Sequence, residues 1–157
     1  RGAMRLIQGL VDWLQPDRQT SGGPEPLSTA LERVRHTVRP GSLVIIISDF
    51  FGLDEHCHRH LSRLRQHSDV IGCQVLDVAE HSLPAGRYPI TDGDQATVLD
   101  TGHGASRNRY ESMGQRHLEE PRRLFQKHDC GWLALNTDDD PVDVLGRELR
   151  VLVGRPV

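Results

Sequence analysis

Residues 43–50 read Leu-Val-Ile-Ile-Ile-Ser-Asp-Phe, and this stretch decides the fold class. The apolar run over 43–47 is rich in β-branched residues and too short for a core helix, so it predicts a strand covered on both faces. Asp54 can cap the helix that follows. A second apolar run over 70–76 comes directly after that helix. Strand, helix and strand in this order are typical of a βαβ crossover and predict an α/β fold with a parallel sheet.

Helical patterns precede this unit. Apolar residues at three- and four-residue spacing predict helices over 4–14 and 27–38. The stretch 16–26 between them contains no large apolar side chain and predicts an exposed loop. The first of these helices needs a surface to pack against.

The remaining elements follow the second strand. An Asp-Gly pair at 92–93 predicts the tight turn of a small hairpin at the sheet edge. A long polar helix over 106–128 is expected to be kinked or split by Pro121. A short strand over 132–135 and a helix that opens at Pro141 complete the chain.

The size and charge of the chain restrict its function. It has 157 residues, which suits a single domain, and its net charge of -3 removes the electrostatic attraction that carries nucleic-acid binding. No apolar run approaches the ~20 residues of a membrane span. The three cysteines are far apart and show no Cys-x-x-Cys spacing, so neither a disulfide framework nor a zinc site is indicated. These features favour a cytoplasmic fragment, although the full-length protein could still be membrane-associated.

Polar side chains follow each predicted parallel strand. They are Ser48-Asp49-Phe50, Asp77, and the run Asn136-Thr137-Asp138-Asp139-Asp140. Because ligands collect beyond the carboxyl ends of parallel strands, this rim is the first place to look for a site. Its oxygen-rich side chains suit a hard cation such as magnesium. The alternative is that the aspartates cap the helices that follow them.

The tract His56-Cys57-His58-Arg59-His60 suggests a transition-metal site at first sight. His56 and His60 share one helix face, but no Glu follows His56 in the His-Glu-x-x-His manner and no further ligand is identifiable. A solvated helix face is the favoured interpretation. The cysteines stand at apolar or strand-flanking positions, where a free thiol behaves as a small hydrophobe.

The strand end Ser48-Asp49-Phe50 resembles that of the bacterial family called domain of unknown function 58, which looks like part of the wider von Willebrand factor A-like group. The resemblance extends over nearly the whole chain, from the helix over 27–38 to the run 133–138. It implies a three-layer, mostly parallel, Rossmann-like sheet with helices on both faces. It also implies a metal-ion-dependent adhesion site, of which Asp49 matches one position. The expected Thr is off register and the Asp-x-Ser-x-Ser motif is missing, so a degenerate site with at most weakly bound magnesium is expected.

Within this resemblance the chain is interpreted as a single domain over residues 1–157 that is N-terminally truncated. The missing first strand would pair with the strand over 43–47. An apolar strand with an open edge invites pairing with another chain, which predicts a homodimer or swapped assembly. The sequence does not decide whether residues 1–4 are native.

Two functions remain open. The first is a non-catalytic protein-interaction module that contacts its partner through Asp49, Phe50 and Phe51, because two aromatics beside a carboxylate form an apolar anchor. At least one of these aromatics could instead fold back into the core. Resemblance to the family implies a MoxR-type AAA+ ATPase as the partner. The alternative is a magnesium-dependent phosphoacceptor or hydrolase that uses Asp49, but the only lysine, Lys127, lies far along the chain from this rim.

Overall fold

A computed structural model describes residues 8, 25–91 and 95–153. Apart from residue 8, the helix expected over 4–14 lies outside the described residues, as does most of the loop after it. The described elements are α2 (Leu27–Thr37), β1 (Leu43–Ser48), α3 (Glu55–Arg65), β2 (Asp69–Leu76), the short 3₁₀ helix η2 (Val78–Glu80), β3 (Arg87–Thr91), β4 (Ala96–Asp100), α4 (Gly104–Lys127), β5 (Gly131–Asn136) and α5 (Pro141–Val153). No helix in the described part of the chain is long and apolar enough to cross a membrane.

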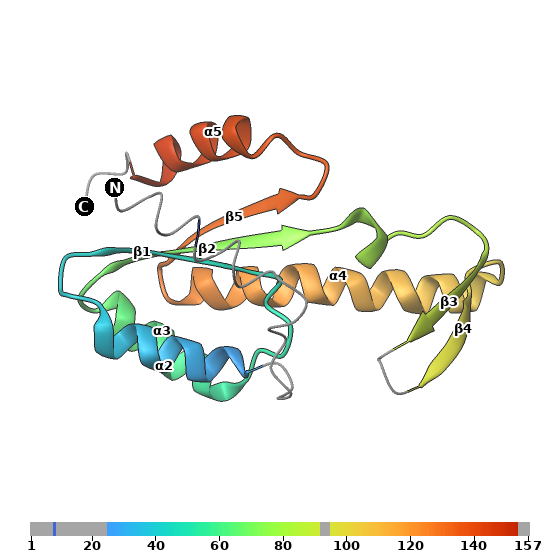
Figure 1. Cartoon of the computed structure of the whole chain (residues 1–157), viewed down its shortest axis with the longest axis horizontal. Coiled ribbons are helices and arrows are strands. Elements are labelled where there is room, and N and C mark those ends of the chain that lie inside the picture. Colours follow the sequence, from blue (N-terminus) through green and yellow to red (C-terminus); the bar gives the residue numbers. More distant parts are fainter. Residues whose placement is uncertain (1–7, 9–24, 92–94, 154–157) are drawn as a thin grey trace.

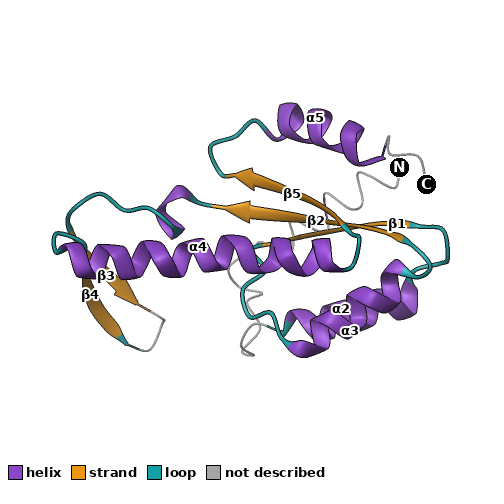
Figure 2. Ribbon diagram, turned by 180° about the vertical axis from the view of Figure 1, so that it is seen from behind, coloured by secondary structure: helices purple, strands orange, loops and turns teal. Residues whose placement is uncertain are grey.

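Three parallel strands form the main sheet in the order β1-β2-β5. Helices α2, α3 and α4 lie on one face of this sheet and α5 lies on the other (Figures 1 and 2). The expected mixed α/β fold with a parallel sheet is therefore confirmed. The larger hydrophobic cluster joins the sheet to α2, α3 and α4, and the smaller one joins β2 and β5 to α5.

Close packing between the sheet and α4 requires a glycine in β2. A Cβ at Gly72 would lie only 2.7 Å from the Trp132 ring and 2.8 Å from the Phe125 ring. Real Cβ atoms do not approach other atoms so closely, so the two aromatic rings occupy the space that a side chain at Gly72 would need. This places both rings against the strand, in the larger cluster.

The expectation that β1 is covered on both faces is wrong for the described residues. Val44 is buried toward α2 and α3, whereas Leu43, Ile45 and Ile47 on the opposite face are exposed. The reason is position: β1 is the edge strand of the sheet, and α5 packs over β2 and β5 through Leu145 and Leu149. Among the described residues, β1 pairs only with β2, and an apolar strip on its outer face is exposed.

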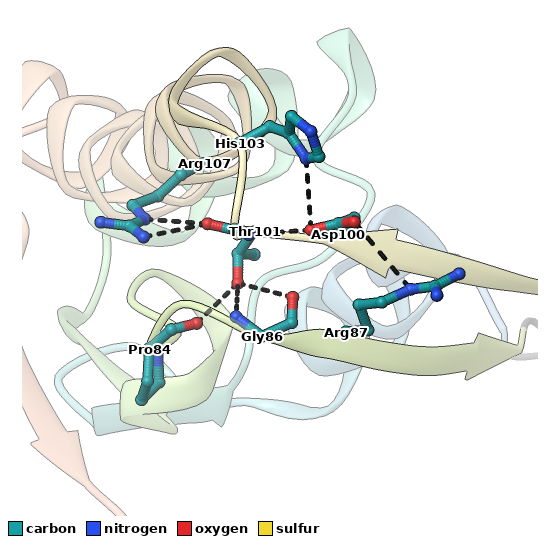
Figure 3. A network of polar contacts seen from close by, with 8 residues as sticks. Pro84, Gly86, Arg87, Asp100, Thr101, His103 and Arg107 are labelled. Carbon is teal, nitrogen blue, oxygen red and sulfur yellow. Dashed lines mark hydrogen bonds and ion pairs between the residues drawn. The ribbon is translucent and has the colours of Figure 1, made fainter.

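The hairpin β3–β4 is a separate two-stranded sheet, so the expectation that it sits at the edge of the main sheet is wrong. It lies beside the first turns of α4 (Figures 1 and 2). Figure 3 shows how it is held: Thr101 Oγ1 is fully buried, donates to Pro84 O at 2.6 Å and accepts from Gly86 N at 3.0 Å. Arg107 of α4 donates through Nε and Nη2 to Thr101 O at 3.1 and 3.0 Å. These bonds fix the hairpin to the helix and not to the sheet.

Helix α4 continues through Pro121 as one element, so of the two expectations, a kink or a split, the split is wrong. Proline lacks the N–H that would bond to the carbonyl of His117 one turn earlier. Gln74 of β2 supplies the missing donor, with its Nε2 lying 3.1 Å from His117 O. The sheet thus satisfies the carbonyl that the proline leaves without a partner.

Candidate functional site

The loop after β1 turns sharply at the carboxyl end of the sheet. Ser48 Oγ accepts a hydrogen bond from Phe50 N at 3.0 Å, and Asp49 Oδ1 accepts one from Phe51 N at 3.0 Å. Phe50 has a φ of +58° and Gly52 a φ of +77°. A left-handed conformation costs a bulky residue about 1–2 kcal/mol, so the loop holds Phe50 there only because other contacts stabilise it.

Those contacts are in the core. The Phe50 side chain is 1% exposed, and its ring centroid lies 5.2 Å from those of Phe125 and Trp132. Burial of an aromatic side chain is worth about 1.5–3 kcal/mol, which offsets the backbone strain. The expectation that Phe50 is part of an exposed anchor is therefore wrong, and the alternative, that one of the two aromatics folds into the core, is confirmed.

Phe51 faces the other way and is 78% exposed. Its ring lies 5.5 Å from the His117 ring of α4. Together with Leu53 and Met113, these two side chains line a surface hollow between the loop and α4. Single exposed apolar side chains are common, but a group that lines one hollow marks a candidate contact surface.

Gln74 connects this loop to α4 and was missed by sequence reasoning. Its side chain is 1% exposed, and Nε2 lies 3.4 Å from Asp49 O and 3.1 Å from His117 O. The backbones on both sides of the hollow are therefore tied to one buried amide. A glutamine within an apolar strand, together with a proline inside a later helix, was the available signal.

A second hollow adjoins the first along α4. Both are lined by Leu53, Arg116 and Glu120, so they form one groove between α4 and the elements after β1. The second hollow is largely charged, and its Glu119 and Arg123 form an ion pair with each other. The groove is thus apolar near Phe51 and polar toward the C-terminal half of α4.

The other carboxylates of the rim mostly serve the backbone, as the helix-capping alternative predicted. Asp77 Oδ1 accepts from Ala79 N at 2.8 Å, and Oδ2 accepts from Thr137 Oγ1 at 2.8 Å. Asp140 caps α5 by accepting from Val142 N at 2.8 Å. The Ala79 N–H and then the Thr137 hydroxyl lower the pKa of Asp77, because both bonds favour the ionised form.

The magnesium site that the resemblance implies is not assembled by the described residues. No three His, Cys, Asp or Glu side chains among them are arranged to hold a metal ion. Asp49 is exposed, and its Oδ1 already accepts from Phe51 N and from Ser48 Oγ. No reaction step can be built through a metal on these side chains.

The histidine tract divides between the surface and the helix interface. His56 is exposed and its Nδ1 lies 2.7 Å from Arg59 Nη2, while His58 contacts His128. Cys57 is fully buried in the larger cluster, as expected of a small hydrophobe. Burial raises the pKa of Cys57 and of Cys130 to about 11, so neither thiol is an activated nucleophile.

Comparisons with known proteins give one match. The model of a family described as "Protein of unknown function DUF58" matches residues 1–120. Neither the curated proteins nor the solved structures contain a match.

Proposed function

Because this chain belongs to the DUF58 family of proteins of unknown function, we propose on its geometry that it is a non-catalytic protein-interaction module. Its contact surface is the groove along α4, of which Phe51, just after β1, lines the apolar end. The proposal rests on the difference in exposure between two adjacent phenylalanines: the Phe50 side chain is buried, while that of Phe51 is 78% exposed.

The exposure of Phe51 is not required by the fold. The left-handed turn at Phe50 is accounted for by the burial of Phe50 itself, and a polar residue at position 51 would leave that turn unchanged. Met113, which is also exposed, and His117 extend the apolar surface around Phe51. Clustered aromatic and methionine side chains with a polar surround are typical of the centre of a protein interface.

The partner is proposed from the resemblance alone. We infer a MoxR-type AAA+ ATPase, in keeping with an A-like domain that acts as its adaptor in the bacterial cytoplasm. The test is a pull-down of that ATPase with the full-length protein and with its Phe51→Ser variant. Val142→Ser is the matched control, because Val142 on α5 is 76% exposed and lies far from the groove along the chain. Loss of capture with Phe51→Ser alone is expected, and equal capture by both variants would refute the surface.

The alternative function, magnesium-dependent chemistry at Asp49, has a separate test. Calorimetry with magnesium and manganese should be carried out on the wild type and on Asp49→Ala. Binding that Asp49→Ala abolishes would favour the alternative over the interaction module. We expect no such heat, because a lone carboxylate leaves a hydrated magnesium ion with most of its water ligands and little affinity.

We also propose that β1 mediates self-association. In the described part of the chain β1 pairs only with β2, and its outer face exposes Leu43, Ile45 and Ile47. An uncharged, apolar edge of this kind pairs readily with a second strand. Light scattering at increasing concentration should detect a dimer that Ile47→Lys weakens. A monomer at every concentration would refute this proposal and leave the Phe51 surface untouched.

A further inference from the structure

A third hollow, with a different chemistry, lies between α3 and the end of α4. Its lining comprises Glu55, His58, Arg59, Ser62, Arg63, Gln66, Lys127 and His128. Three of these side chains carry permanent positive charges, against one carboxylate, in a chain whose net charge is -3. The only lysine in the sequence is among them.

Two imidazoles meet in this hollow. His58 Nδ1 lies 3.4 Å from His128 Nε2, and the two rings are 5.6 Å apart at 68°. Both side chains are half-buried. Burial, then repulsion by His58 and by Lys127, lowers the pKa of His128, while Asp129 acts in the opposite direction. Little negative charge therefore lies close to the two imidazole rings.

The cations of the hollow are poorly neutralised. Arg59 Nη2 lies 2.7 Å from His56 Nδ1, and neither Arg63 nor Lys127 has an ion-pair partner among the described residues. Arg65, on the same helix, turns away to donate to Asp129 O at 3.0 Å. Like charges gathered without counter-charges repel one another, and an anion between them would relieve that repulsion.

We propose that this hollow binds a tetrahedral oxyanion, the phosphate or sulfate group of a ligand, through Arg63, Lys127 and the His58–His128 pair. Arginine and lysine side chains and protonated imidazoles supply the charge-assisted hydrogen bonds that such oxygens accept. The hollow meets the polar end of the groove, with which it shares Glu55 and His58, but Phe51 does not line it. The oxyanion proposal therefore does not rest on the contact surface that Phe51 forms.

The alternative ligand for this hollow is a transition-metal ion bound by the imidazole nitrogens of both His58 and His128. Zinc binds imidazole nitrogens at about 2.0–2.1 Å, so two nitrogens 3.4 Å apart suit a tetrahedral ion. The other side chains decide between the two ligands. Arg59, Arg63 and Lys127 would repel a dication, and Glu55 is the only carboxylate in the lining.

The first experiment is an NMR titration of the full chain with sulfate at constant ionic strength. We expect saturable shifts in α3 and at residues 127–128. Affinity should fall by about tenfold or more in Arg63→Gln/Lys127→Gln, because this variant removes two charge-assisted hydrogen bonds to the anion. The matched control is Arg39→Gln/Arg109→Gln, which removes the same charge from exposed positions elsewhere. Equal losses in both double variants, or no saturation, would overturn the site.

The second experiment tests the histidines. Sulfate keeps its charge between about pH 7.5 and pH 6, so any tightening over that range reports protonation of the protein. Protonation adds positive charge at His58 or His128, beside Arg59, Arg63 and Lys127 and against Glu55 and Asp129. We expect several-fold tighter binding at the lower pH and no such gain in His58→Asn. A gain that persists in both His58→Asn and His128→Asn would refute their part in the site.

Two further probes identify the source of the phosphate group. Glycerol 3-phosphate that competes with sulfate would indicate a soluble phosphomonoester. Sedimentation with phosphatidylglycerol vesicles, lost in Arg63→Gln/Lys127→Gln, would indicate a lipid headgroup. If neither probe binds, the proposal that the hollow takes the phosphate group of a ligand fails.

Discussion

The loops that follow β1 and β2 lie at the same end of one parallel sheet, and both begin with an aspartate. In the loop after β2, Asp77 accepts from Ala79 N and from Thr137, and Glu80 completes a capping box with it. The following residue, His81, packs so closely on α4 that a Cβ at Gly114 would lie 2.6 Å from its Cα. The loop after β1 is also fixed at its base, but it leaves the Phe51 ring in solvent.

This difference separates a structural loop from a candidate recognition loop. Around Asp77, hydrogen bonds join the strand end to the residue after β5 and to its own helical turn, so that the carboxylate is used within the protein. Around Asp49, the same kinds of bond position two backbone N–H groups, and the rigid turn that results presents an aromatic side chain. Contact surfaces are frequently built on loops that a rigid scaffold positions in this way.

The sharpest way to test this view is to truncate the two adjacent phenylalanines in turn. Phe50→Ala removes a ring from a site enclosed by Phe125 and Trp132, and should lower the free energy of unfolding by about 3–5 kcal/mol. Phe51→Ala removes an exposed ring and should change it by about 0.5 kcal/mol or less. Urea unfolding measures both. Similar losses in the two variants would mean that Phe51 belongs to the core.

The sequence is sufficient to predict the parallel strands, but not to predict which of Phe50 and Phe51 is buried. The runs over 43–47 and 70–76 predict parallel strands because their apolar patterns are local. Which of the two phenylalanines is buried depends on the space between Phe125 and Trp132, which come much later in the chain. The open edge of β1 was expected, but its exposed face was missed, because the packing of α5 over β2 and β5 rather than over β1 is a property of the whole topology.

A second prediction concerns Gln74, whose side-chain amide joins the loop after β1 to α4. Gln74→Met keeps the volume but removes the donor to Asp49 O and His117 O, and should cost about 1–3 kcal/mol because buried carbonyls lose their partner. Pro121→Ala restores an N–H that can bond to His117 O. In that background we expect Gln74→Met to cost about 1 kcal/mol less. A double-mutant cycle in urea measures this coupling, and additive effects would contradict it.

Sequence reasoning missed Gln74, because the available signal is split between two distant parts of the chain. Its neighbours in β2 are apolar, and nothing nearby in the chain requires an amide. The requirement comes from Pro121, whose missing N–H leaves a carbonyl open on the helix that crosses this strand. The rim aspartates were easier to interpret, because Asp77 and Asp140 cap the turns directly after them.

The smallest expected effect concerns Asp77 in the loop after β2, and it depends on pH. Hydrogen bonds lower the pKa of Asp77 below its ordinary value of 3.8 in the folded state. The carboxylate therefore contributes stability at pH values above 3.8, and this contribution is lost as the pH falls through the lower folded pKa. Asp77→Asn should lower the urea midpoint at neutral pH and match the wild type near pH 2. Asp138→Asn removes the same charge from the rim and serves as the control. If both variants followed the same pH profile, the change in net charge would explain the effect. The hydrogen bonds of Asp77 with Thr137 and Ala79 would then not stabilise the loop after β2.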